Sequence, residues 1–164
     1  MDDAVQIDEF PQYLINPEGR VWNSRTGKEV QPGMTKTGLV KINLYRDKVL
    51  YTRSLPLLVA RAFLPNDRNP EVFNTPIHLD CNPHNNHVSN LAWRPRWFAV
   101  LYYKQQFFET HQKNMLCIKD LDTGEIVGGI ADACRRYGVL SADIIDSEGY
   151  GQKIFPTQKR LAIY

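Results

Sequence analysis

The sequence predicts an α+β fold made of small antiparallel hairpins and a few short helices. Short segments that alternate apolar and polar residues recur within residues 7–64, and turns containing Gly or Asp separate them. Helical patterns follow at residues 55–63, after Pro95, and twice more between residues 130 and 146. Hairpins therefore come first, and a smaller unit of one hairpin and two helices ends the chain.

The composition is that of an ordinary globular protein. Of its 164 residues 23% are charged and 43% hydrophobic, and the net charge is +2. No apolar run approaches the roughly 18 residues that span a bilayer, and the first residues are acidic where a signal peptide is basic. The three cysteines are widely spaced and form no Cys-x-x-Cys pair. We therefore expect a cytoplasmic protein with reduced thiols and no membrane association.

The first 64 residues are expected to form hairpins packed on one helix. The expected strands are residues 13–15, 19–22, 40–45 and 48–52. Pro56 is a helix-start residue, and the helix that it opens places Leu58, Val59, Ala62 and Phe63 on one face. These four side chains are expected to belong to the core.

Residues 76–93 are the part of the sequence richest in side chains that can bind a metal, transfer a proton or fix a turn by hydrogen bonds. It contains three of the four histidines and a cluster of asparagines. We expect a strand to end at His78, an Asn/Pro loop to turn through Asx-type hydrogen bonds, and a second strand to return at residues 90–93. His78 and Asn90 would then face each other.

This stretch resembles the ββα-metal core, or His-Me finger, of HNH homing endonucleases of the phage intron type. The matching positions are His78, Asp80, Asn82, Asn85, Asn86, Val88, Asn90, Leu91 and Trp93. The strings at residues 13–21 and 55–63 resemble the nuclease-associated module of the same enzymes, and residues 116–146 resemble their C-terminal helix-turn-helix repeat. The resemblance implies that His78 is a general base, that Asn90 orients the His loop, and that Mg²⁺ or Mn²⁺ would serve an active nuclease.

The metal ligands of the family are the part that does not match. Ile77 stands where the family has an acidic residue or His, and Ala99 stands where it has a final Asn or His. Neither side chain has a lone pair to give to a divalent ion. Cys81 also replaces the Gly of the loop. We therefore expect no metal and no cofactor, with Asp80 and His87 as the remaining candidates for a regrouped site.

The expected domains are residues 1–95, a linker helix at 96–115 that completes the ββα unit, and a C-terminal module at 116–164. The linker carries an excess of aromatic residues, which suits either packing or a protein interface. The interface candidates are Trp97, Phe98, Tyr102, Tyr103, Phe107 and Phe108.

The C-terminal module lacks the basic character of a DNA-reading unit. Its second helix carries Asp143 and Asp146, with Glu148 at its end, where the family places Ser, Arg and Lys. From residue 116 onward six basic residues stand against seven acidic ones. Asp143 and Asp146 are therefore assigned to the same expected partner interface.

Three functions are open at this point: an active metal-dependent DNA-nicking endonuclease, an inactive DNA-binding protein, and an inactive protein-binding factor. The second would use the basic residues of the N-terminal module, Arg20, Arg25, Lys28, Lys36 and Lys41. The third would be a regulator, inhibitor or accessory subunit in a phage or similar mobile element. The missing ligand side chains at the metal positions and the missing basic side chains in the C-terminal module favour an inactive DNA- and/or protein-binding factor. The active nuclease is the alternative. The oligomeric state stays open.

Overall fold

The computed structural model describes residues 3–36, 38–109, 116–147 and 151–164, with only the backbone described at 106–109. Its contacts divide the chain into two compact units, Met1–Trp93 and Arg94–Tyr164. The finer division into three parts, with a linker at 96–115, stays a prediction. None of the described helices has the length and apolar character needed to cross a bilayer.

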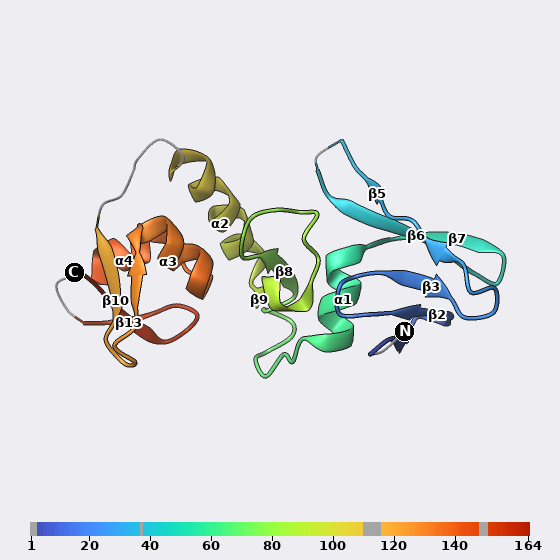
Figure 1. Ribbon diagram of the computed structural model, residues 1–164, viewed down its shortest axis with the longest axis horizontal. Coiled ribbons are helices and arrows are strands. Elements are labelled where there is room, and N and C mark those ends of the chain that lie inside the picture. Colours follow the sequence, from blue (N-terminus) through green and yellow to red (C-terminus); the bar gives the residue numbers. More distant parts are fainter. Residues whose placement is uncertain (1–2, 37, 110–115, 148–150) are drawn as a thin grey trace. The chain divides into compact units, whose positions relative to one another are not determined.

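The N-terminal unit contains two antiparallel sheets and helix α1, Leu55–Phe63. The four-stranded sheet has the order β1 (Val5–Ile7), β2 (Phe10–Ile15), β3 (Val21–Asn23), β4 (Glu29–Val30). The three-stranded sheet has the order β5 (Gly33–Met34), β6 (Val40–Arg46), β7 (Val49–Ser54). Helix α1 lies between these sheets and the hairpin that carries the His loop (Figure 1).

Strict alternation along β6 explains how the three-stranded sheet is held. Val40, Ile42 and Leu44 are buried in the core of the unit, whereas Asn43 and Tyr45 point to solvent. Successive side chains of a strand point to opposite faces, so one face of this sheet packs and the other is open. Ser54 precedes α1 and Pro56 lies in its first turn, as the sequence predicts.

The His loop is carried by a two-stranded sheet of β8 (Thr75–His78) and β9 (Leu91–Arg94). A short 3₁₀ helix, η1 (Val88–Asn90), leads from the loop into β9. The loop itself turns through Asx-type hydrogen bonds: the Asn82 N–H donates to Asp80 Oδ1 at 2.8 Å, and the His84 N–H donates to Asn82 Oδ1 at 3.0 Å. The hairpin and its turn chemistry are therefore confirmed.

The C-terminal unit packs helices on one small sheet. Its helices are α2 (Arg96–Glu109), α3 (Gly129–Tyr137) and α4 (Ser141–Ser147). Its strands are β10 (Cys117–Asp120), β11 (Ile126–Gly128), β12 (Lys153–Ile154) and β13 (Lys159–Ile163), in the order β11-β10-β13-β12. Ile118, Cys134, Ile144 and Leu161 form the centre of its core. Strands β12 and β13 were not expected from the sequence.

Three side chains from β9 and α2 bind backbone groups at the turn between α3 and α4. The buried guanidinium of Arg94 donates to the carbonyl oxygen of Gly138 at 2.9 Å and to that of Tyr137 at 3.2 Å. The Tyr102 hydroxyl donates to the Cys134 carbonyl at 3.2 Å. Gln105 donates to the Val139 carbonyl and accepts from the Ser141 N–H. The Tyr137 carbonyl at the end of α3 and the Gly138 carbonyl that follows it thus receive side-chain donors at a position where a helix has no donors of its own left.

Candidate functional site

His78 is the central residue of the candidate site. It ends β8, and only 6% of its surface is exposed. Its Nε2 lies 3.0 Å from Oδ1 of Asn86, whose own amide nitrogen donates to the carbonyl oxygens of Pro83 and His84. Because the Asn86 oxygen can only accept, this arrangement assigns the proton of neutral His78 to Nε2 and leaves Nδ1 as the basic atom.

Asn90 holds the loop and does not contact His78 through a hydrogen bond. Its Nδ2 donates to Asp80 Oδ1 and to the Asn85 carbonyl, both at 2.8 Å, and its Oδ1 accepts from the Asp80 N–H at 3.0 Å. Asn86 is therefore the side chain that is hydrogen-bonded to the ring, whereas Asn90 fixes the loop; that His78 and Asn90 face each other stays a prediction. Both asparagines lie in the same motif. Their positions in the folded loop decide which of them reaches the imidazole.

Asp80 is a structural acceptor within the His loop. Its Oδ1 accepts from Asn82 and Asn90, and its Oδ2 accepts from Asn85 Nδ2 at 2.7 Å. Burial by itself would raise the pKa of Asp80, but these hydrogen bonds outweigh it and hold the pKa below its ordinary value. The carboxylate is therefore ionised and engaged by the loop at neutral pH.

Replacing Asn90 with Ala should destabilise the chain by about 2–3 kcal/mol, because buried donors and acceptors of the loop lose their partner. Urea unfolding measures the loss. Asn43→Ala is the matched control, since this Asn is exposed and accepts one hydrogen bond, from Thr52. An Asn90→Ala variant as stable as the control would contradict the role assigned to Asn90.

Burial lowers the pKa of His78, although the hydrogen bond to Asn86 and the nearby Asp80 carboxylate oppose the change. The pKa of His78 is therefore lower in the folded state than in the unfolded state. At a pH between these two values, the folded protein binds fewer protons at this residue than the unfolded chain does. Stability should therefore fall as the pH drops below about 6.5, the ordinary His value. Thermal unfolding between pH 7.5 and 5 should show this loss, and His78→Gln should reduce it. Equal pH dependence in both proteins would exclude His78 as the cause.

The side chains at the ligand positions of the HNH pattern do not fit the divalent ion that the HNH core implies. Ile77 is fully buried, and Ala99 lies on α2 with no donor atom. The Asp80 carboxylate is occupied by the loop, and His87 Nδ1 is bonded to Ser89 while its Nε2 lies 3.9 Å from Glu18. Among the described residues no three His, Cys, Asp or Glu side chains converge as a metal-binding group.

Cys81 occupies a backbone conformation that glycine adopts more readily. Its φ is +58°, in the left-handed region, and its N–H donates to the His78 carbonyl at 3.0 Å. The loop therefore keeps the backbone shape that requires a Gly in the family pattern, although the Gly itself is absent.

The aromatic candidates of α2 lie in different environments. Phe98 and Tyr102 are fully buried, with Phe98 against Phe155 and Tyr102 bonded to Cys134, so these two pack inside their unit and cannot belong to an open interface. Trp97 is 55% exposed and stacks on Phe155. Tyr103 is half-buried. Phe107 and Phe108 lie outside the residues whose side chains are described.

The acidic candidates lie on α4. Asp146 is exposed and Asp143 is half-buried. Burial raises the pKa of Asp143, and the neighbouring Asp146 carboxylate raises it further. Glu148 lies outside the described residues. The two described carboxylates therefore form an acidic surface on this helix.

The basic candidates lie around β3 to β6 in the N-terminal unit. Arg20 is held by Glu29 through two contacts of 2.8 and 3.0 Å. Arg25, Lys28 and Lys36 are exposed, and Lys41 points from the open face of β6. Within the described residues these last four side chains make no ion pair, so they retain charge that is available to a ligand.

Comparison with known proteins agrees with the motif and the fold. No family model matches the chain. Two HNH endonucleases of Acanthamoeba polyphaga mimivirus, both uncharacterized, are 32% identical over 91 residues and 35% identical over 93 residues. These matches cover 56% and 57% of this chain and 27% and 23% of the relatives, so the chain spans about a quarter of their length.

A solved structure extends the similarity to the fold. The HNH homing endonuclease I-HmuI, described in its DNA binding and cleavage, superposes with a TM-score of 0.54 over 98% of this chain and 97% of that one, at 18% identity. At this identity the superposition establishes the fold alone. The motif around His78, the similarity to the two viral relatives and this fold together support an HNH endonuclease-like protein.

Proposed function

We propose that the protein is a catalytically inactive HNH homing-endonuclease-like factor that binds DNA without cutting it. The observation that carries this proposal is the pair of ligand positions, which hold Ile77 and Ala99 while the Asp80 carboxylate is committed to the loop. A divalent ion at such a site needs oxygen or nitrogen ligands. His78 is kept as a buried, oriented imidazole without the groups that would complete the reaction.

The DNA-binding surface proposed here is the basic region of the N-terminal unit. Residues 20–54 carry eight basic and two acidic side chains, although the whole chain has a net charge of only +2. The open face of β6 and β7 presents Lys41, Asn43 and Thr52, which can bind phosphates and base edges. Electrostatic attraction to phosphates would supply most of the affinity.

A second candidate function, protein binding, is favoured by the surface of the C-terminal unit. Trp97, Val100 and Leu101 on α2 are each more than 40% exposed, and α4 carries acidic side chains that would repel phosphates. The factor would then be a regulator, inhibitor or accessory subunit. A setting in a phage or related mobile element, acting in the host cytoplasm, is part of the same proposal and accords with relatives from a virus.

A combined nicking and gel-shift assay on plasmid and genomic DNA tests the proposal. The unaltered protein should shift DNA at low salt and should produce no nicks with Mg²⁺ or Mn²⁺. Nicking that depends on metal and disappears in His78→Ala would establish the alternative, an active endonuclease. Absence of any shift would overturn DNA binding.

Replacing Lys28, Lys36 and Lys41 together with Gln should weaken DNA binding by about tenfold or more and reduce the salt dependence by roughly 3 in the slope of log K against log salt. The matched control replaces Lys104, Lys119 and Lys153 of the C-terminal unit, which changes the net charge equally. Equal losses in both triple variants would show that net charge, rather than the N-terminal face, governs binding.

A further inference from the structure

We propose that the groove between β1 and α1 binds an extended peptide segment that carries a lysine or arginine, with the segment adding to the free edge of β1. The site lies within the N-terminal unit and is separate from the His loop. It gives the protein a docking surface for a partner protein beyond the DNA-binding role.

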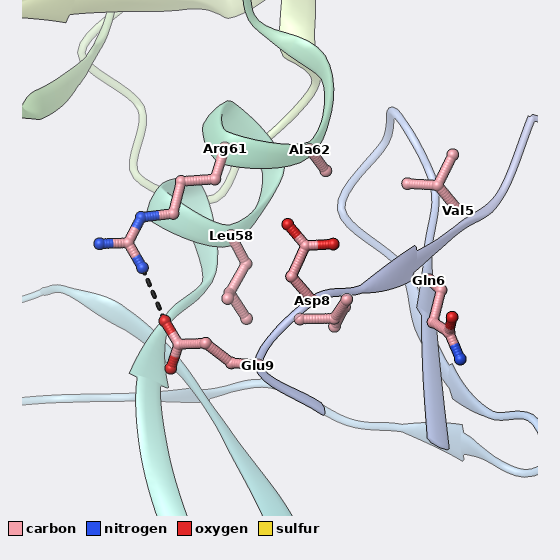
Figure 2. A pocket seen from close by; sticks show the side chains of 8 residues that line it. Val5, Gln6, Asp8, Glu9, Leu58, Arg61 and Ala62 are labelled. Atoms are coloured by element: carbon pink, nitrogen blue, oxygen red, sulfur yellow. Dashed lines mark hydrogen bonds and ion pairs between the residues drawn. The ribbon is translucent and has the colours of Figure 1, made fainter. Parts of the chain in front are cut away.

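The groove contains a cavity of about 350 Å³. It is lined by the consecutive residues 5–9 and, from α1, by Leu58, Arg61 and Ala62 (Figure 2). This volume lies within the range of ordinary ligand sites. Val5, Gln6 and Ile7 of this lining belong to β1, and Asp8 and Glu9 form the turn that follows, so the cavity runs beside the strand and ends at its turn.

Strand β1 is the end strand of its sheet and pairs only with β2. In an antiparallel pair alternate residues direct their N–H and C=O groups away from the partner strand. Throughout the described part of the chain, no segment other than β2 forms a backbone hydrogen bond with Val5, Gln6 or Ile7. These outward groups can therefore accept an added strand, the mode by which many domains bind extended peptides.

The charges in the groove favour a peptide with a basic side chain. The Asp8 carboxylate points into the cavity and takes part in no ion pair among the described residues (Figure 2). The neighbouring Arg61 is bound by Glu9 at 2.8 Å, and Glu9 also binds Arg53 at 3.0 Å. The cation that lines the cavity, Arg61, is thus already paired, whereas Asp8 can receive a new one.

The apolar part of the groove suits the stem of the same side chain. Leu58 and Ala62 lie one turn apart on the same face of α1, and Val5 lies across from them. Lys and Arg bury their methylene stems against apolar surface while their charged heads reach a polar partner. A basic side chain therefore meets both properties of the cavity.

Chemical-shift changes in the ¹⁵N-labelled full-length protein provide the test. The probe is an acetylated, amidated five-residue peptide, Thr-Val-Lys-Val-Thr in order, compared with the same peptide carrying Glu at its centre. The Lys peptide should shift the amides of residues 5–9 and 58–62, and the Glu peptide should not. The Asp8→Asn variant should bind the Lys peptide at least about tenfold more weakly. Asp67→Asn, an exposed loop carboxylate, is the matched control and should leave binding unchanged.

A Lys peptide with N-methylated backbone amides separates strand addition from simple side-chain capture. The proposal expects this peptide to lose binding, because it cannot donate to the edge of β1. Equal binding of the methylated peptide, equal binding of the Glu peptide, unchanged binding to Asp8→Asn, or no shift at millimolar peptide would each overturn the proposal.

Discussion

Replacing Ile77 with Asp and Ala99 with Asn should convert a protein that does not nick DNA into one that does so with Mg²⁺ or Mn²⁺. The two changes supply the ligand types that the HNH pattern places at these positions. The orientation of His78 by Asn86 and the closure of the loop by Asn90 are already present. Nicking should rise about 100-fold or more above the level of the unaltered chain, the scale on which charge stabilisation in active sites operates.

The double variant has a second measurable property besides activity. Ile77 is fully buried, so an aspartate there without a counter-ion should destabilise the protein by roughly several kcal/mol. Mn²⁺ should restore part of this stability, because a ligand that binds only the folded state stabilises it. His78→Ala in the same background should abolish nicking and keep the Mn²⁺ effect. A double variant that binds Mn²⁺ but never nicks would show that His78 is no longer placed for the reaction.

Arg94→Ala should be among the most destabilising single substitutions in the C-terminal unit. Arg94 is 9% exposed, and its guanidinium donates to the carbonyl groups of Tyr137 and Gly138, which lose this donor when the side chain is removed. Hydrogen bonds from charged groups contribute about 1.5–3 kcal/mol each, so we expect a loss of roughly 3–5 kcal/mol.

Hydrogen exchange of the α3 and α4 amides measures this effect directly. Exchange should accelerate in Arg94→Ala and should change little in Arg96→Ala, whose side chain is exposed and makes no ion pair among the described residues. Arg94→Lys should recover only part of the protection, because an ammonium group lacks the planar fork that reaches two carbonyls. Unchanged exchange in Arg94→Ala would show that the turn is stable without this side chain.

Local sequence patterns were sufficient for the β6–β7 hairpin, for the hairpin that carries the His loop and for the turns of that loop. Alternation identifies β6 and β7, Pro56 marks the first turn of α1, and the Asp80 and Asn82 turns follow from the side-chain chemistry of Asx residues. These features depend on neighbours within a few positions. The candidate base and the missing ligands could be named for the same reason.

Features that depend on distant residues could not be derived in this way. The side chain that is hydrogen-bonded to the His78 ring is Asn86 rather than Asn90, and the spacing within the motif does not reveal this. Phe98 and Tyr102 are core residues because α3 and the segment around Phe155 pack against them, and nothing in the linker itself reveals this. Strand β13 is short and pairs with β10, whose residues lie more than 40 positions earlier, and β12 in turn pairs only with β13.

The contacts of α2 with the turn between α3 and α4 decide where the chain could be joined to a different C-terminal module. A junction placed at residue 116, where the C-terminal module begins in the sequence, would part Arg94, Tyr102 and Gln105 from the backbone groups that they bind. A junction placed before Arg94 keeps each donor with its acceptor. Recombinants that inherit residues 94–164 together should therefore fold, and the linker helix should be inherited with the C-terminal helices rather than with the hairpin that precedes it.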